Sequence, residues 1–185
     1  FGLMVTRTIW VHHAEEQSIP LVLGMINIKT RSLELILQTP EETRKLIDGW
    51  TPAERAELSA DWLAFVESAT SPDPWIHGFT VKHQARDAAI GSCGFKGPPN
   101  ADGVVEIAYG IDPDHQGNGY ATEAAQALVS YAFNNSNVHV VRAHTLPEAN
   151  ASTRVLTKCG FRQLGEVMDP EDGLVWRWEK DDDSA

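Results

Sequence analysis

The sequence predicts a single α+β domain built on a mixed, mostly antiparallel sheet. Three features indicate this class: three strand-like runs separated by turn-rich loops, one β-α-β unit in the second half, and two helical segments near the start. The chain has 185 residues, 42% of them hydrophobic and 22% charged, so it is long enough to bury one core. We expect one domain over residues 25–180.

The two ends of the chain differ from this domain. Residues 1–24 do not join smoothly to the segment that opens at Met25, and we expect them to be an extension to which no function is assigned. Residues 181–185 are expected to be an acidic tail.

The first half of the domain is expected to contain one strand and two helices. Residues 33–37 alternate as a strand does. A helix should follow Thr39, a good N-cap, with Pro40 at its first position and acidic residues in its first turn. A second helix is expected from Thr51 to Ser68. Its apolar face should consist of Leu58, Trp62, Phe65 and Val66.

The second half is expected to hold six strands and two helices. The loops HQARD and KGPPNADG separate the first three strands and favour an antiparallel meander. The predicted strands cover residues 75–82, 88–95, 104–111, 138–144, 161–167 and 174–178, and the helices cover 121–133 and 151–159. The apolar positions 121, 124, 125, 128 and 132 should form the buried face of the first of these helices. The whole domain would then have seven strands and four helices.

Composition and charge exclude several classes of protein. The net charge of −11, from 15 basic and 26 acidic residues, disfavours binding to nucleic acids or anionic membranes and favours cationic or amine-bearing partners. The same acidity is equally compatible with solubility alone. No apolar run approaches the roughly 20 residues of a membrane helix, and no secretory signal is evident, so we expect a cytoplasmic protein. Cys93 and Cys159 form neither a disulfide pattern nor a metal motif.

The stretch HQGNGYATEAA, which begins at His115, indicates an anion site. A strand that ends in a glycine-bearing turn and runs into a helix presents unpaired N–H groups at the positive end of the helix dipole. Gly117, Gly119 and Ala121 would allow a diphosphate to approach the backbone. An ordinary tight connection is the alternative. No Gly-Lys-Ser/Thr follows, and Glu123 stands where a dinucleotide fingerprint needs a small residue, so another phosphate-bearing cofactor is required.

Two runs carry a family resemblance. EIAYGIDPDHQGNGYATEAAQALVSYAF resembles the acetyl-CoA-binding core of the GCN5-related N-acetyltransferases (GNAT), in which Gln116, Gly119 and Ala121 match the loop motif Gln/Arg-x-x-Gly-x-Gly/Ala. ASTRVLTKCGF resembles the next signature of the branch that acetylates ribosomal-protein N-termini, the RimJ/RimL type. That register is occupied by Ser152, Leu156, Lys158, Gly160 and Phe161. The resemblance extends over residues 33–178.

The resemblance implies both a fold and an activity. The GNAT fold has a sheet splayed between its fourth and fifth strands, with the pantetheine arm in the opening. The activity would be acetyl-CoA-dependent transfer of an acetyl group to a primary amine, on a protein N-terminus or a small molecule, directly within a ternary complex. No metal is implied, and a homodimer is compatible with it. The expected cofactor-binding residues are Ile111, Gln116, Gly117, Asn118, Gly119, Tyr120, Ala121, Thr122 and Asn150.

Glu106 is the predicted catalytic base. It lies in an otherwise apolar strand, and an acidic residue on this strand often deprotonates the amine in the resembling family. Apolar walls should raise its pKa toward neutrality. A solvated glutamate on the strand face is the alternative. Gly110 in the same strand suggests a bulge that frees backbone N–H groups near Gly110 and Ile111 for the oxyanion.

The second predicted catalytic residue is Ser152. In the RimJ/RimL-type branch a serine at this place assists the leaving thiolate, and Leu156 replaces the tyrosine of many other members. A role for Ser152 as a helix cap or first-turn residue is the alternative. Ala149 stands where the family usually has asparagine, and Asn150, one position late, would contact the pantetheine amides or cap the helix.

Other candidates are weaker. A histidine at a strand end such as His144 is typically structural, whereas His77 and Trp75 are expected to line the acceptor side. Cys159 has no nearby histidine in sequence and is not expected to be a nucleophile. Because the tyrosine is missing, a non-catalytic module that binds acyl-CoA is the alternative function.

Overall fold

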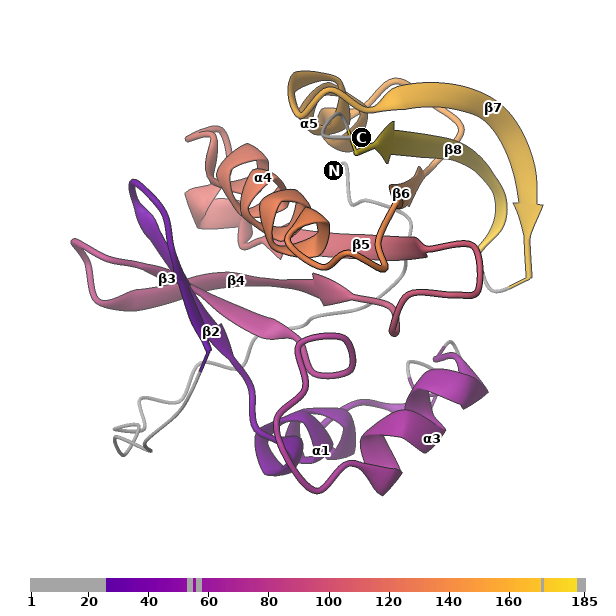
Figure 1. The fold of residues 1–185 in the computed structure, drawn as a ribbon. Helices are drawn as coiled ribbons and strands as arrows, with labels where there is room; N and C mark the ends of the chain where they lie inside the picture. Colours follow the sequence, from indigo (N-terminus) through magenta and orange to yellow (C-terminus); the bar gives the residue numbers. More distant parts are fainter. Residues whose placement is uncertain (1–25, 53–54, 56–57, 171, 183–185) are drawn as a thin grey trace.

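The computed structural model describes residues 26–52, 55, 58–170 and 172–182, and these residues form a mixed sheet flanked by helices (Figure 1). The strands are β1 (Asn27–Lys29), β2 (Leu33–Leu37), β3 (Phe79–His83), β4 (Ala88–Phe95), β5 (Val104–Ile111), β6 (Val140–Thr145), β7 (Arg162–Asp169) and β8 (Gly173–Asp181). The helices are α1 (Pro40–Asp48), α3 (Ala60–Ser68), α4 (Tyr120–Phe133) and α5 (Ala151–Lys158), and a short 3-10 helix, η1, covers Pro113–His115. The predicted α+β class is confirmed. No helix in these ranges is long and apolar enough to cross a membrane.

The sheet has eight strands in the order β1-β2-β3-β4-β5-β6-β8-β7. Every neighbouring pair is antiparallel except β5 and β6, which are parallel because α4 crosses between them. The expected count of seven strands was one short. The additional strand, β1, has only three residues at the edge of the sheet, too few for a visible alternation in the sequence. At the other end, β8 extends to Asp181, which pairs with Val140.

Two predicted elements have other bounds in the structure. The strand expected from residue 75 begins at Phe79, because the preceding residues form a turn in which the N–H of His77 donates to the carbonyl of Asp73 at 2.8 Å. The helix expected over residues 51–68 is interrupted: Pro52 and Arg55 are helical, Leu58 and Ser59 are not, and α3 begins at Ala60. Ser59 is its N-cap, and the Ser59 hydroxyl accepts from the N–H of Trp62 at 3.3 Å.

Helices α1 and α3 share a small hydrophobic cluster separate from the main core. Ile47, Trp50 and Val66 form its buried centre, and Leu58 and Trp62 pack against it as predicted. Phe65 was wrongly assigned to this face, since 40% of it is exposed. The predicted cap of α1 is confirmed: Thr39 and Glu42 form a capping box, which stabilises a helix by about 1 kcal/mol.

Helix α4 covers the sheet on the side opposite α1 and α3 in Figure 1. Its buried face includes Ala124, Ala125, Leu128 and Ala132, as the periodicity predicted. These side chains belong to the same core as Val105, Ile107 and Tyr109 of β5. The small alanines let the helix lie close to the strand, so the start of α4 is fixed against the end of β5.

The parallel strands β5 and β6 separate after a short contact. Their pairing covers only Val104–Glu106 with Val140–Arg142, whereas β4 remains paired with β5 as far as Ile111. The second half of β5 therefore has an edge that β6 does not cover. This separation confirms the predicted opening, because β5 and β6 are the fourth and fifth of the seven strands expected from the sequence.

The close approach of β4 to β5 predicts a sensitive position at Gly91. A Cβ atom added there would lie 2.2 Å from the carbonyl oxygen of Gly110, so Gly91→Ala must push the two strands apart. We expect a loss of about 1 to 3 kcal/mol in the free energy of unfolding, measured by urea denaturation. Gly110→Ala is the matched control, because the Cβ added at Gly110 meets nothing within 4 Å. Equal stability of the two variants would contradict this packing.

Candidate functional site

The glycine loop adopts a backbone that few residues other than glycine accept. Gly117 and Gly119 have φ angles of 79° and 83°, in the left-handed region. Gly119 is the N-cap of α4, and no side chain caps the helix. A Cβ at either glycine would meet nothing within 4 Å. The conformation, and not lack of space inside the protein, is what requires glycine at these positions.

The loop presents a run of unpaired backbone amides. Gln116 N–H donates to the Pro113 carbonyl at 3.3 Å, and Glu123 N–H donates to the Gly119 carbonyl at 3.0 Å. Between them, the N–H groups of residues 117–122 reach no acceptor among the described residues. The loop is exposed as far as Gly119. Six amides at the start of a helix are thus available to an anion, whereas the amide of Gln116, predicted to join them, is occupied.

The polar side chains of the loop brace it internally. Gln116 Nε2 donates to the Ile111 carbonyl at 2.8 Å, and Asn118 Nδ2 donates to the His115 carbonyl at 3.0 Å. The Tyr120 hydroxyl lies 2.9 Å from Nε2 of His83. No Lys or Arg occurs in residues 97–141. Within this segment, the groups that would attract an anion are the backbone amides and the helix dipole.

Glu123 fastens the first turn of α4 to the β1–β2 turn. Its Oε1 accepts from the Thr30 hydroxyl and from the Ser32 N–H, both at 2.6 Å. Burial raises the pKa of Glu123, but these hydrogen bonds outweigh burial and hold the pKa below its ordinary value. The carboxylate of Glu123 is thus hydrogen-bonded to Thr30 and Ser32 and not to the exposed amides.

The uncovered edge of β5 offers further amides. Lys96 N–H donates to the Glu106 carbonyl, and Asp112 N–H donates to the Ile90 carbonyl, each at 2.9 Å. Because bonding alternates along an antiparallel pair, the even residues of β5 face β4 and the odd residues face the opening. The amides of Tyr109 and Ile111 therefore point into the opening.

The bulge expected at Gly110 is absent. The pairing of β4 with β5 runs without a register shift from Phe95↔Ile107 to Gly91↔Ile111. Alternation directs the Gly110 N–H toward β4, so of the two predicted oxyanion donors only Ile111 faces the opening. The divergence of β5 from β6 exposes these amides, and no distortion of the strand is needed.

The start of α5 supplies two more polar groups. Asn150 is its N-cap: Oδ1 accepts from the Thr153 N–H at 3.1 Å, while the buried Nδ2 has no partner in the described structure. Ser152 is 5% exposed and lies in the first turn. Since Asn150 and Thr153 form the capping box, Ser152 is not the cap, and its hydroxyl is not used to start the helix.

Helix α5 links this end of the opening to the glycine loop. Cys159, at its C-terminal end, donates its thiol to the Thr122 carbonyl at 3.7 Å. Eight helical residues span about 12 Å. The start of α5, where Asn150 and Ser152 lie, is therefore about 12 Å along the helix from its end at Cys159. Glu106 lies five residues before Ile111 on β5, which corresponds to about 17 Å along the strand.

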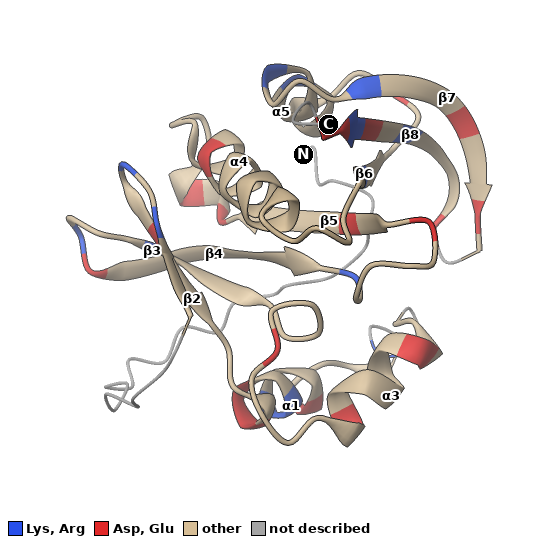
Figure 2. Cartoon of the chain, viewed as in Figure 1, with Lys and Arg blue, Asp and Glu red and all other residues tan. Residues whose placement is uncertain are grey.

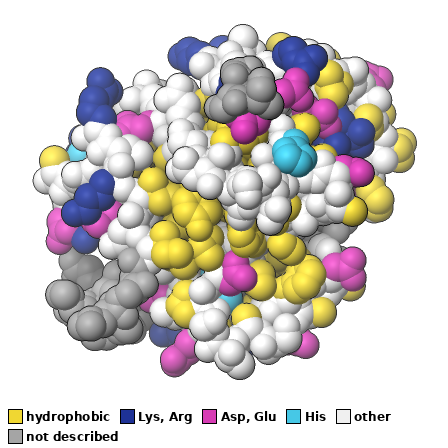
Figure 3. All heavy atoms as spheres, viewed as in Figure 1, with side chains coloured by type: hydrophobic (Ala, Val, Ile, Leu, Met, Phe, Trp, Pro, Cys, Tyr) yellow, Lys and Arg dark blue, Asp and Glu magenta, His cyan; other side chains and the backbone are white. Residues whose placement is uncertain are grey.

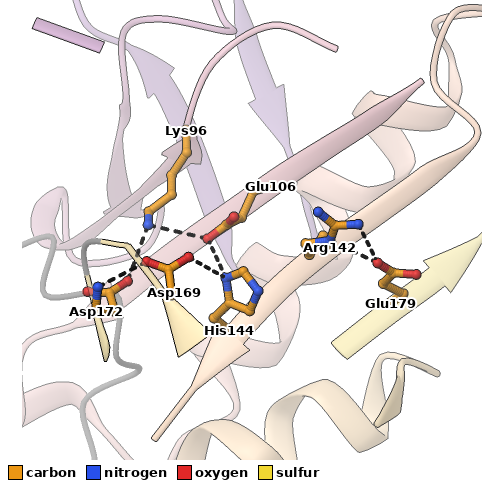
Figure 4. A network of polar contacts seen from close by, with 7 residues as sticks. All are labelled: Lys96, Glu106, Arg142, His144, Asp169, Asp172 and Glu179. Atoms are coloured by element: carbon orange, nitrogen blue, oxygen red, sulfur yellow. Dashed lines mark hydrogen bonds and ion pairs between the residues drawn. The ribbon is translucent and has the colours of Figure 1, made fainter. Parts of the chain in front are cut away.

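Glu106 lies in a network of charged side chains at the point where β5 and β6 part (Figure 4). Its Oε1 is 3.1 Å from Nδ1 of His144 and 3.3 Å from Nζ of Lys96. Lys96 Nζ is also 3.4 Å from Asp172, and His144 Nδ1 is 3.9 Å from Asp169. No three of the His, Cys, Asp and Glu side chains in the described part are arranged to hold a metal ion.

The predicted pKa of Glu106 was wrong in direction. Burial does raise it, but the hydrogen bond from His144 and the positive charge of Lys96 are stronger together and hold the pKa below its ordinary value. Glu106 is therefore a carboxylate throughout the neutral range. The prediction failed because it considered only the apolar neighbours of Glu106 along β5.

Sequence reasoning missed the partners of Glu106. Lys96 could have been found, because it ends the strand that pairs with β5 and bonds across to Glu106. His144 was interpreted as structural because a lone histidine at a strand end carries no specific signal. Asp169 and Asp172 lie at the β7–β8 turn, which only the tertiary fold brings to β5.

The other candidates from the sequence, His77, Trp75 and Cys159, do not belong to the charged network around Glu106. His77 is fully buried, its Nδ1 accepts from the Asp73 N–H at 2.9 Å, and burial lowers its pKa. Trp75 packs against Phe95 and Tyr131 with its ring tilted to theirs, and it lines an open cavity of about 450 Å³ beside Asn100. That cavity contains none of the predicted catalytic residues. Burial raises the pKa of the Cys159 thiol to about 11, which disfavours a nucleophilic role.

Apolar side chains gather on one face of the molecule. Figure 3 shows them between the strands and the α1–α3 pair. Figure 2 shows acidic residues on α1, on α3 and along β7 and β8, with basic residues on α1, β7 and β8 as well.

Comparisons with known proteins identify the family. The sequence pattern of the acetyltransferase (GNAT) domain matches residues 28–162. The uncharacterized N-acetyltransferase p20 of Bacillus licheniformis is 33% identical over 132 residues, 71% of this chain and 72% of that protein. The probable N-acetyltransferase YjcK of Bacillus subtilis is 41% identical over 59 residues, 32% of this chain and 33% of that protein. The chain belongs to the GNAT acetyltransferase family.

Solved structures show the same fold. RimL, the ribosomal L7/L12 alpha-N-protein acetyltransferase in complex with coenzyme A, has a TM-score of 0.65 at 14% identity, with 86% of this chain and 100% of that chain covered. The aminoglycoside acetyltransferase AAC(6')-Ib with coenzyme A and kanamycin has a TM-score of 0.58 at 22% identity, covering 81% and 95%. The predicted GNAT fold is confirmed.

The low pKa of Glu106 predicts a pH-dependent contribution to stability. A carboxyl group whose pKa is lower in the folded than in the unfolded protein stabilises the fold above its ordinary pKa and loses this effect as the pH falls. We expect Glu106→Gln to lower the free energy of unfolding by about 1 to 3 kcal/mol at pH 7, and by less below about pH 4.

Urea denaturation at both pH values measures this difference. Glu67→Gln, at an exposed position on α3, is the control and should have little effect at either pH. A destabilisation by Glu106→Gln that stays constant from pH 7 to pH 3.5 would contradict the stabilised carboxylate.

Proposed function

We propose that this GNAT-family protein binds acetyl-CoA and transfers its acetyl group directly to a primary amine, with both substrates bound at once. The observation that carries the proposal is the run of six unpaired amides over residues 117–122 at the start of α4. Amides at a helix N-terminus bind phosphate groups, and the diphosphate of coenzyme A fits the exposed, glycine-lined loop. Proteins of the same fold have been solved with coenzyme A bound.

The two sides of the opening would hold the rest of the cofactor. From the loop, the pantetheine arm would follow the edge of β5, where the Ile111 amide is uncovered. Across the opening, the buried Nδ2 of Asn150 lacks an acceptor, and a pantetheine carbonyl would supply one. The arm would run toward the start of α5, which lies about 12 Å along that helix from the contact between Cys159 and Thr122. The thioester would then lie between Ser152 and Glu106.

Different residues of the chain would assist different steps of the acetyl transfer. Acetyl-CoA supplies the activated acetyl group. The acceptor's ammonium would first lose one proton to solvent, because only the free amine has a lone pair with which to attack. Glu106 would then take a second proton from the nitrogen as it bonds to the carbonyl carbon, since the nitrogen becomes strongly acidic at that stage. The edge amides of β5 would stabilise the oxyanion, a contribution of about 3 to 4 kcal/mol in comparable sites. The Ser152 hydroxyl would donate to the leaving thiolate. We therefore keep Glu106 and Ser152 as the catalytic residues.

The acceptor is expected to be cationic. Glu106, Asp169 and Asp172 gather at the opening, and the chain carries a net charge of −11. Both acceptor classes named for proteins of this fold, a protein N-terminus and an aminoglycoside, carry amines. The RimJ/RimL-type signature around Ser152 favours the protein N-terminus.

Thiol release tests the activity. The purified chain is mixed with acetyl-CoA and a panel of amines that includes ribosomal-protein N-terminal peptides, polyamines and aminoglycosides, and free coenzyme A is followed with a thiol reagent. We expect turnover with at least one amine. Binding of acetyl-CoA by calorimetry without turnover on any amine would favour the non-catalytic acyl-CoA-binding module.

The glycine loop predicts a binding defect in Gly119→Val. A β-branched side chain at φ 83° strains the loop and stands beside the amides, so fewer of them can reach a phosphate. Because each hydrogen bond to a charged group contributes about 1.5 to 3 kcal/mol, the Kd for coenzyme A should rise at least about tenfold by calorimetry. Gly173→Val, at φ 73° in the β7–β8 turn, imposes similar strain and should leave the Kd unchanged.

The state of Glu106 predicts the effect of pH on turnover. Glu106→Gln should lower kcat by about 100-fold or more, while the Kd for acetyl-CoA stays within error. In the wild type, Glu106 is ionised at neutral pH, so the acidic limb of the rate profile should follow the pKa of the acceptor amine. Two acceptors with different amine pKa values separate the possibilities. An acidic limb that stays in place when the acceptor changes would assign the titration to the enzyme.

A further inference from the structure

His144 is a buried imidazole held directly beside the predicted catalytic carboxylate. It lies on β6, two residues beyond Arg142, the last residue of that strand to pair with β5. Only 3% of its side chain is exposed, and its Nδ1 lies 3.1 Å from Oε1 of Glu106 (Figure 4). The contact crosses the point at which the two strands separate, so it joins the two sides of the opening at its base.

The two oxygens of Glu106 are not equivalent. Oε1 receives both partners, with His144 Nδ1 at 3.1 Å and Lys96 Nζ at 3.3 Å. No hydrogen bond or ion pair within the described residues reaches Oε2, and this oxygen is not among the fully buried unpaired atoms. With 19% of the side chain exposed, Oε2 is the oxygen available to an incoming group.

The surroundings of His144 define its tautomer. A carboxylate oxygen only accepts, so Nδ1 must carry the proton that it donates. Nε2 is buried and has no partner among the described residues. A doubly protonated ring would bury a second N–H without an acceptor, which is costly. The neutral ring with its proton on Nδ1 avoids that cost.

We infer that His144 is a positioning residue for the transfer reaction: its Nδ1–H fixes Oε1 of Glu106 and thereby aims Oε2 at the acceptor amine. This inference rests on the proposed function. Lys96 holds the charge of the carboxylate but is a flexible, rotatable donor, whereas the imidazole is rigid and packed. His144 therefore fixes the orientation of the Glu106 carboxylate. A misplacement of about 1 Å at a reacting group costs about 100-fold in rate.

Two substitutions separate the hydrogen bond from the packing. His144→Asn places an amide N–H near the position of Nδ1 and keeps a donor for Glu106. His144→Leu fills similar space without a donor. We expect the leucine variant to lose about 10- to 100-fold in kcat with an unchanged KM for acetyl-CoA, and the asparagine variant to stay near wild type. Equal kcat values for the two variants, with equal melting temperatures, would overturn the inference.

A double-mutant cycle shows whether His144 acts through Glu106. On the Glu106→Gln background, His144→Leu should cause no further loss of kcat, because the group it positions has already lost its charge. A full additional loss would assign His144 an independent role and overturn the inference. Absence of turnover by the wild type on every amine would instead overturn the proposed function, and the inference with it, so the two failures are distinguishable.

Nitrogen-15 NMR of the histidine rings gives a readout apart from activity. The wild type at neutral pH should show His144 protonated at Nδ1 and not at Nε2. In Glu106→Gln, whose amide no longer only accepts, the preference should weaken toward a mixture. A wild-type ring protonated at Nε2 and not at Nδ1 would exclude the Nδ1–H contact and overturn the inference.

Discussion

The site depends on one constraint, the short contact between β5 and β6. These two parallel strands pair over three residues and then diverge, while β4 stays bonded to β5 as far as Ile111. Bonding alternates along a strand, so the divergence leaves the amides of Tyr109 and Ile111 facing an opening. The same divergence separates the ends of the strands, from which α4 and α5 begin. The glycine loop, the cap of α5 and Glu106 are all positioned by this single feature.

The two ends of this opening differ in their electrostatics, since the glycine loop would bind an anion and the base contains the Glu106 carboxylate. At the loop, a chain of net charge −11 would bind an anion with backbone amides and a helix dipole, since the segment from residue 97 to residue 141 contains no Lys or Arg. At the base, Glu106 would be costly to bury as an ion. Lys96 and His144 outweigh the cost of burial, so the carboxylate remains charged.

Local patterns in the sequence predicted the local parts of the structure. The cap at Thr39, the apolar face of α4 and the glycine loop were all predicted, because each depends on residues a few positions apart. The break at Ser59 and the pKa of Glu106 were not, because they depend on packing and on partners from distant strands. Asp169 and Asp172 had no signal of their own. The register of the β4–β5 pair would have revealed Lys96.

A crystal structure with acetyl-CoA tests the central claim most directly. The account predicts density for the diphosphate within hydrogen-bonding distance of the amides of residues 117–122, with the arm passing between β5 and β6 and the thioester near Ser152. Density for the diphosphate at any other part of the protein, with the glycine loop empty, would contradict it.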